Sequence, residues 1–172
     1  MADNPDRSAV SSSGTDVLIE YDQWLERIDA TYRSVAFCCW HRLGDRVAAD
    51  EVSAQVVAHL VAKPAVFRYF GLPFSGRIAR SAERGIAQAK EGTLPTSRGW
   101  PCLIGRLQQV PLEHREILVL ACIDNLDDTA LAEALGCDTQ AAQDRKVASM
   151  QYWDQLASGV LGDASEVAVA EN

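Results

Sequence analysis

The apolar residues of this chain recur at helical spacing over most of its length, and the strict alternation of a half-buried strand is scarce. This pattern predicts an all-α fold. The first helix is expected to begin near Thr15 or Asp16, either of which is a suitable N-cap, and to end at Gly44. Further helices are expected over about 47–62, 74–90, 101–109, 112–123, 127–135 and 139–157.

A polar stretch divides this helical pattern into two parts. It contains Gly92, Pro95, Ser97 and Gly99 with little apolar content, which is typical of a linker. We therefore expect two small helical domains joined by a flexible linker. The expected order is a disordered N-terminal segment, a first domain, the linker, a second domain and an acidic tail, at residues 1–14, 15–90, 91–100, 101–157 and 158–172.

The charge of the chain is acidic overall but unevenly distributed. The 172 residues carry a net charge of −8, which argues against indiscriminate nucleic-acid binding, because phosphate contacts depend on Lys and Arg. Residues 63–90 hold six basic side chains and one acidic one, whereas residues 106–152 hold four basic and eight acidic ones. Positive charge is therefore concentrated in residues 63–90 and negative charge in residues 106–152.

Several function classes lack the residue patterns that they require. Five cysteines without a C-x-x-C pair fit neither a disulfide framework nor a common zinc site, so no metal or cofactor is expected. The three histidines lie far apart without a nucleophile or a carboxylate pair, and a phosphate-binding Gly-rich loop is missing, so an enzyme is not expected. The sequence shows neither a signal peptide nor a bilayer-spanning apolar stretch, which predicts a cytoplasmic protein without membrane contact.

The most specific local pattern is a pair of short helices joined by a tight turn. Residues 127–135 and the helix from Thr139 flank Gly136-Cys137-Asp138, where the glycine permits a left-handed backbone and Asp138 or Thr139 caps the second helix. Ala132 is the small residue at the expected helix contact. The pattern predicts a helix-turn-helix unit, although an ordinary αα-hairpin would produce it as well.

The same region carries a resemblance to a known family. The run 107–120, LQQVPLEHREILVL, is similar to the "LPPEHREVLVLRY" run that opens the fourth region of bacterial group IV (extracytoplasmic-function) RNA polymerase sigma factors. Residues 126–137, LDDTALAEALGC, are similar to the continuation of that region, and residues 42–57 are similar to its second region. The resemblance covers roughly residues 17–90 and 101–156, and it implies a transcription factor with two helical domains.

By this resemblance, core RNA polymerase is the expected partner of the first domain. Asp50, Glu51 and Gln55 would present acceptors and an amide to basic groups of the polymerase. Without the resemblance, the same three residues are the solvated face of an amphipathic helix.

The segment after Pro64 corresponds to the part of the family that melts promoter DNA. Unpaired bases stack on aromatic faces while arginine neutralises the backbone, and each stacked base contributes about 1–3 kcal/mol. Three of the arginines have the spacing i, i+3, i+7 and so share one helix face. The expected DNA-binding residues here are Arg68, Tyr69, Phe70, Arg77, Arg80 and Arg84. The alternative is that the aromatic residues belong to the core and the arginines to an ordinary surface.

The second helix of the helix-turn-helix unit would contact promoter DNA in the major groove. The residues expected to do so are Thr139, Gln140, Gln143, Arg145 and Lys146. Only two of them are basic, and Gln143 occupies a position that is usually Lys in the family. Fewer phosphate contacts are therefore expected than in a typical member.

The sequence leaves more than one function open. The first is a sigma factor that binds core polymerase and promoter DNA and starts transcription. The alternative is a sigma-like regulatory protein that binds polymerase or another regulator, such as an anti-sigma factor, without starting transcription. The acidic balance of residues 106–152 motivates this alternative. A helix-turn-helix repressor without polymerase contact would instead dimerise on a palindromic site.

Overall fold

The computed structural model describes residues 9–65 and 76–162, and every regular element within them is helical. The expected all-α class is confirmed for this part of the chain. In chain order, the elements are α1 (Ala9–Leu43), α2 (Arg46–Val61), α3 (Gly76–Glu91), α4 (Gly99–Gln108), α5 (Leu112–Ile117), the π-helix η2 (Leu118–Ile123), α6 (Asp128–Leu135) and α7 (Thr139–Leu161).

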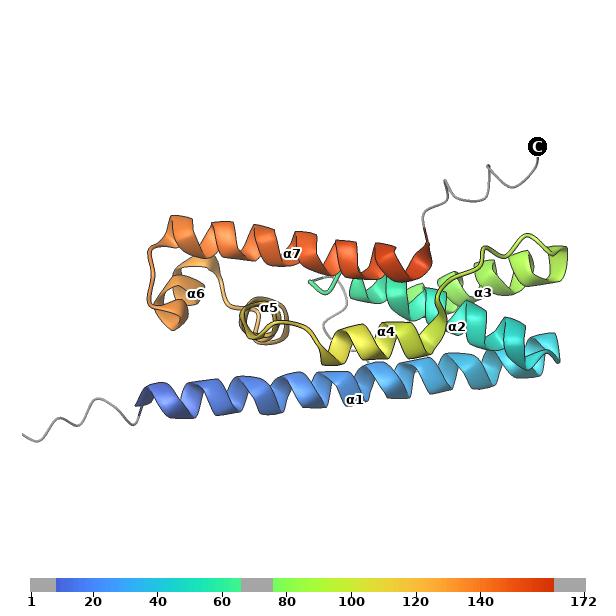
Figure 1. Cartoon of the computed structure of the whole chain (residues 1–172), viewed down its shortest axis with the longest axis horizontal. Helices are drawn as coiled ribbons and strands as arrows, with labels where there is room; N and C mark the ends of the chain where they lie inside the picture. The colour runs from blue at the N-terminus through green and yellow to red at the C-terminus, as the bar shows by residue number, and fades with distance from the viewer. Residues whose placement is uncertain (1–8, 66–75, 163–172) are drawn as a thin grey trace, which may run out of the picture.

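The two longest helices, α1 and α7, lie along opposite sides of the molecule (Figure 1). Between them, α5 and α6 lie toward one end, α4 lies in the middle, and α2 and α3 lie toward the other end. α1 packs against α2 and α3 and also against α5 and η2. One helix of the first expected domain therefore contacts elements of the second.

Both expected domains contribute to one hydrophobic core. Its fully buried side chains include Tyr21 and Trp24 from α1, Val57 from α2, Leu107 from α4 and Trp153 from α7. The Trp24 and Trp153 rings meet edge to face, with centroids 5.6 Å apart, and the Tyr21 hydroxyl donates a buried hydrogen bond to the Leu107 carbonyl at 2.7 Å. The described parts of the first expected domain, 15–65 and 76–90, are thus packed against residues 101–157.

A smaller cluster of buried residues lies under α6. It is built from the end of α5, η2, α6 and the start of α7, and consists of Ile117, Ala121, Cys122, Leu131, Ala132 and Ala142. Met150 is half-buried and packs against both this cluster and the main core. The α6–α7 pair is therefore continuous with the rest of the molecule through apolar contacts.

The ends of the long helices differ from the sequence expectation. α1 begins at Ala9, so residues 9–14, which were expected to be disordered, are helical. Val17 and Tyr21 are buried and anchor this end, and once a helix is nucleated each added residue costs little. α7 likewise continues to Leu161, beyond the expected end at residue 157, because Val160 is buried in the core.

The stretch expected to be a flexible linker, 91–100, is bonded to α2 and α7 through Pro95, Ser97 and Arg98. The Ser97 amide donates to the Glu51 carboxylate of α2, and the Gln55 amide donates to the Pro95 carbonyl. The Arg98 amide donates to the Val160 carbonyl of α7 at 2.8 Å. Proline, serine and glycine suit an extended segment as well as a mobile one, and here side chains of α2 supply the hydrogen-bond partners.

The shared core predicts that the molecule unfolds as one unit. Replacing Trp153 with alanine should lower the free energy of unfolding by about 3–5 kcal/mol, because it leaves a cavity between α1 and α7. Urea denaturation followed by circular dichroism should show one cooperative transition for the wild type. The control is Val47→Ala at a side chain that is 80% exposed, which should change stability little. Two separate transitions in the wild type would contradict the shared core.

Candidate protein and nucleic-acid interfaces

The first candidate interface is the exposed edge of α2. Asp45 caps this helix, accepting hydrogen bonds from the Val47 amide at 2.9 Å and the Ala48 amide at 3.2 Å. The buried residues of α2 then face α1, α3, α4 and α7. Asp50 is left exposed, and Glu51 and Gln55 are left half-buried at the margin of the core.

The polar atoms of these three residues are bonded within the chain. Asp50 accepts from the Tyr32 hydroxyl at 3.1 Å, and burial together with the Asp50 charge raises the Tyr32 pKa to about 12. Glu51 accepts from the Ser97 amide and, at 2.8 Å, from the Gln55 side chain. The structure therefore brings the expected polymerase-binding residues together, and each has an intramolecular partner.

Trp100 belongs to this network and was missed in the sequence. Its ring stacks on Tyr32, with centroids 4.1 Å apart and an angle of 6° between the planes. A large aromatic residue at the end of a polar stretch indicates that this end of the stretch packs against a neighbouring helix, here through Tyr32 of α1. Tyr32 thus contacts both Trp100 and Asp50, and it joins the 95–100 segment to the expected interface.

The second candidate interface is the basic face of α3. Arg77, Arg80 and Arg84 are exposed, and within residues 9–65 and 76–162 none of them forms an ion pair. The acid between them in the sequence, Glu83, is paired with Arg42 of α1, and this hydrogen bond lowers the Glu83 pKa. The arginines are therefore not neutralised by their own helix.

A glycine sets the position of α3 on α2. A Cβ atom on Gly85 would lie only 2.6 Å from the Val52 Cγ1 atom, so a larger residue would push the helices apart. The close packing leaves the arginine face pointing to solvent. The other expected members of this interface, Arg68, Tyr69 and Phe70, lie outside the described residues.

The third candidate interface is the α6–α7 pair. Asp127 caps α6 by accepting from the Ala130 amide at 2.9 Å, and Asp138 caps α7 by accepting from the Ala141 amide at 2.8 Å. Gly136 has φ 63°, the left-handed backbone expected for the turn. The cap and the turn residue are thus the ones that the sequence indicates.

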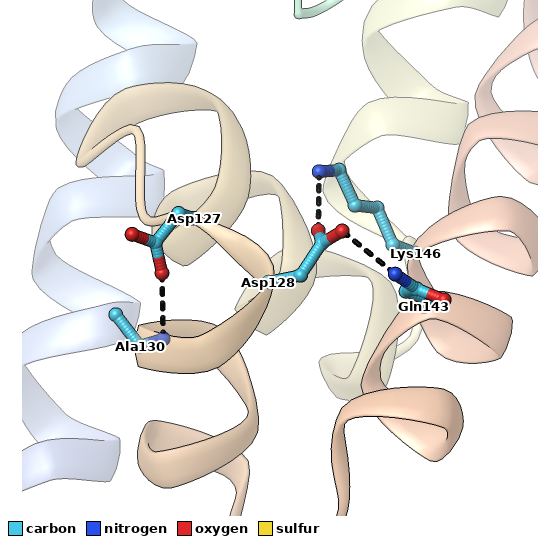
Figure 2. A network of polar contacts seen from close by, with 5 residues as sticks. All are labelled: Asp127, Asp128, Ala130, Gln143 and Lys146. Carbon is cyan, nitrogen blue, oxygen red and sulfur yellow. Dashed lines mark hydrogen bonds and ion pairs between the residues drawn. The ribbon is translucent and has the colours of Figure 1, made fainter.

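Two of the expected DNA-binding side chains are bound to an acid of α6 (Figure 2). The Gln143 amide donates to Asp128 Oδ2 at 2.9 Å, and the Lys146 ammonium group donates to Asp128 Oδ1 at 3.0 Å. The hydrogen bond from Gln143 contributes most to lowering the Asp128 pKa. The hydrogen bond and the positive charge of Lys146 lower it further. Asp128 had no assigned role in the sequence, because a pair formed across a turn leaves no periodic signal.

The remaining expected DNA-binding residues lie on the exposed surface of α7. Thr139 begins the helix, and Gln140 donates to the Asp144 carboxylate at 3.0 Å. Arg145 is exposed beside a groove lined by Glu113 and Glu116. The positive charge on this face is therefore surrounded by acidic side chains.

The comparisons with known proteins add no further assignment. No protein-family model, curated protein or solved structure matches the chain. None of the helices in the described ranges is long and apolar enough to cross a membrane. The same ranges contain no group of three or more His, Cys, Asp or Glu side chains that could hold a metal ion.

The Asp128 contacts predict a shift in titration that depends on Gln143. Replacing Gln143 with leucine should raise the Asp128 pKa toward its ordinary value of 3.8, because the largest stabilising hydrogen bond is lost. Carboxyl ¹³C chemical shifts followed against pH would measure this change. Gln140→Leu is the matched control, because Gln140 bonds Asp144 instead and should leave the Asp128 pKa unchanged.

The sign of the pH effect follows from the lowered pKa. Because the folded-state pKa of Asp128 is below its unfolded value, its contribution to stability is present above that unfolded value and is lost as pH falls through the folded one. The wild type should therefore lose more stability than Gln143→Leu on acidification. Equal losses in both proteins would contradict the assigned contact.

Proposed function

We propose that the protein is a sigma-like transcription regulator that binds core RNA polymerase and does not bind promoter DNA through α7. The resemblance of residues 42–57, 107–120 and 126–137 to sigma-factor regions supports the polymerase partner. The claim that α7 does not bind promoter DNA rests on one observation, the hydrogen bonds that Gln143 and Lys146 donate to Asp128. Side chains that must bind phosphates or bases are held by a carboxylate instead.

The loss of DNA contact has a direct physical reason. DNA affinity comes largely from cations that displace counterions from phosphates, so a lysine already neutralised by a carboxylate contributes less. Asp128 would also have to approach the phosphates together with Lys146, at a cost from like-charge repulsion. Both effects act against groove binding by this face of α7.

The caps of α6 and α7 strengthen this effect. A helix N-terminus is a ready anion site, because its unpaired amides and its dipole favour negative charge. In these two helices the site is filled by Asp127 and Asp138, each within hydrogen-bonding distance of an amide. A DNA phosphate at either N-terminus would therefore meet a carboxylate.

The polymerase contact is proposed for α2. Asp50 and Glu51 carry negative charge and Gln55 carries an amide, a combination suited to basic groups on a partner protein. A salt-dependent complex with core polymerase is expected, because these charges steer association.

A second candidate function is favoured by the face of α3. Arg77, Arg80 and Arg84 are exposed and form no ion pair within the described residues, because Glu83 is paired with Arg42. An initiating sigma factor would use such a face to hold the backbone of separated promoter strands. Run-off transcription with purified core enzyme distinguishes the two functions. Specific transcripts would establish initiation, whereas core binding without transcripts on a genomic promoter library supports the regulator.

The Asp128 contact gives a direct test of the proposed DNA defect. Asp128→Ala should release Lys146 and Gln143 and tighten binding to a DNA duplex, with a salt dependence steeper by about one counterion. Fluorescence anisotropy with a labelled duplex at several salt concentrations measures both quantities.

The matched control for that test is Asp144→Ala. It also removes one negative charge from the α6–α7 pair but leaves the Asp128–Lys146 ion pair intact, because Asp144 bonds Gln140. A larger gain for Asp128→Ala than for Asp144→Ala supports the proposal. Equal gains, or tight duplex binding by the wild type, would refute it.

A further inference from the structure

We propose that residues 95–100 form an intramolecular latch over the edge of α2, so that a partner reaches Glu51 and Gln55 only after this segment is released. The polymerase identity of that partner rests on the proposed function. The latch itself is a property of the chain and is tested without a partner.

The centre of the latch is the Glu51 carboxylate. One of its oxygens, Oε1, accepts both the Ser97 amide and the Gln55 side chain, and the Gln55 side chain also donates to the Pro95 carbonyl. A hydrogen bond to an ionised carboxylate is stronger than one between neutral groups. A partner that donates to Glu51 must therefore displace Ser97 or share the same oxygen with it.

The aromatic end of the latch reaches Asp50 through Tyr32, and the Asp50 side chain itself is exposed. Trp100 stacks on Tyr32, whose hydroxyl donates to Asp50. The stack holds the tyrosine ring against α2, and it places the hydroxyl where a partner's donor would have to bind. Glu51 and Gln55 are thus bonded by the 95–100 segment, and Asp50 is bonded by Tyr32, whose ring stacks on Trp100 of that segment.

The latch also connects α2 to the C-terminal end of α7. The Arg98 amide donates to the Val160 carbonyl at 2.8 Å, and the Gly99 amide donates to the Ser97 hydroxyl at 3.0 Å. Release of the segment would therefore loosen a contact between the two halves as well as expose α2. Partner binding at α2 is in this way coupled to the position of α7.

Release does not require global unfolding. Pro95, Thr96 and Arg98 are exposed, and the segment is held by a few hydrogen bonds, one ring stack and a single half-buried apolar side chain, Trp100, which packs against the main core. Segments of this kind open at a free-energy cost below that of the whole molecule. A partner with donors for Glu51 would shift this local equilibrium toward the open form.

Amide hydrogen exchange of the isolated full-length protein tests the latch. In the wild type, the Ser97 amide should be protected. In Glu51→Ala, it should exchange at least tenfold faster, because its acceptor is lost, whereas the Ala130 amide, which donates to Asp127 outside the latch, should be unchanged and serves as the internal control. Exchange of the wild-type Ser97 amide at the rate of an unstructured peptide would overturn the proposal.

Two variants that leave the α2 residues intact test the gating. Ser97→Pro removes the donor to Glu51, and Trp100→Leu removes the stack on Tyr32. Each should bind purified core polymerase roughly tenfold more tightly than the wild type. Thr96→Pro, which keeps the Ser97 amide, is the control and should bind as the wild type does.

The outcomes separate this proposal from the one on which it rests. Equal binding by wild type, Ser97→Pro and Trp100→Leu would overturn the gating role. If no variant binds core polymerase, the proposed partner is wrong, and the exchange rate of the Ser97 amide alone decides whether α2 is covered.

Discussion

The contact between α1 and the helices of the C-terminal half is the constraint on which the rest of the structure depends. Trp24 meets Trp153 edge to face, and Tyr21 reaches the Leu107 carbonyl inside the core. Burying these large aromatic side chains removes a great deal of apolar surface from water, and neither half can do so alone. Because the two halves share this core, the segment that connects them must lie along the surface of α2, where it meets Glu51 and Gln55.

This packing explains why polar residues of the α2 interface form hydrogen bonds within the chain. A polar segment that crosses a packed surface must satisfy its own amides and carbonyls, and the side chains of α2 are the nearest partners. In the α6–α7 pair, the Asp128 side chain accepts hydrogen bonds from the Gln143 and Lys146 side chains across the turn. The arginine face of α3 is the exception, because Glu83 is drawn to Arg42 on α1.

Local features of the sequence were sufficient to predict most of the helices. Gly136 and Asp138 end one helix and begin the next through interactions within a few residues, and both have the expected roles. The pairs on which the proposed function rests are long-range. Asp128 and Lys146 are separated by 18 residues, and Glu51 and Ser97 by 46, so their contact depends on how helices pack rather than on any periodic pattern. The composition of residues 91–100 fits a mobile linker and a bound segment equally well.

The shared core is the central claim, and proton NMR of the free full-length protein tests it most directly. With ring centroids 5.6 Å apart, the indole protons of Trp24 and Trp153 should give nuclear Overhauser cross-peaks. Absence of these cross-peaks, with the contacts inside each half retained, would show that the two halves are separate. The latch on α2 would then lose its structural basis.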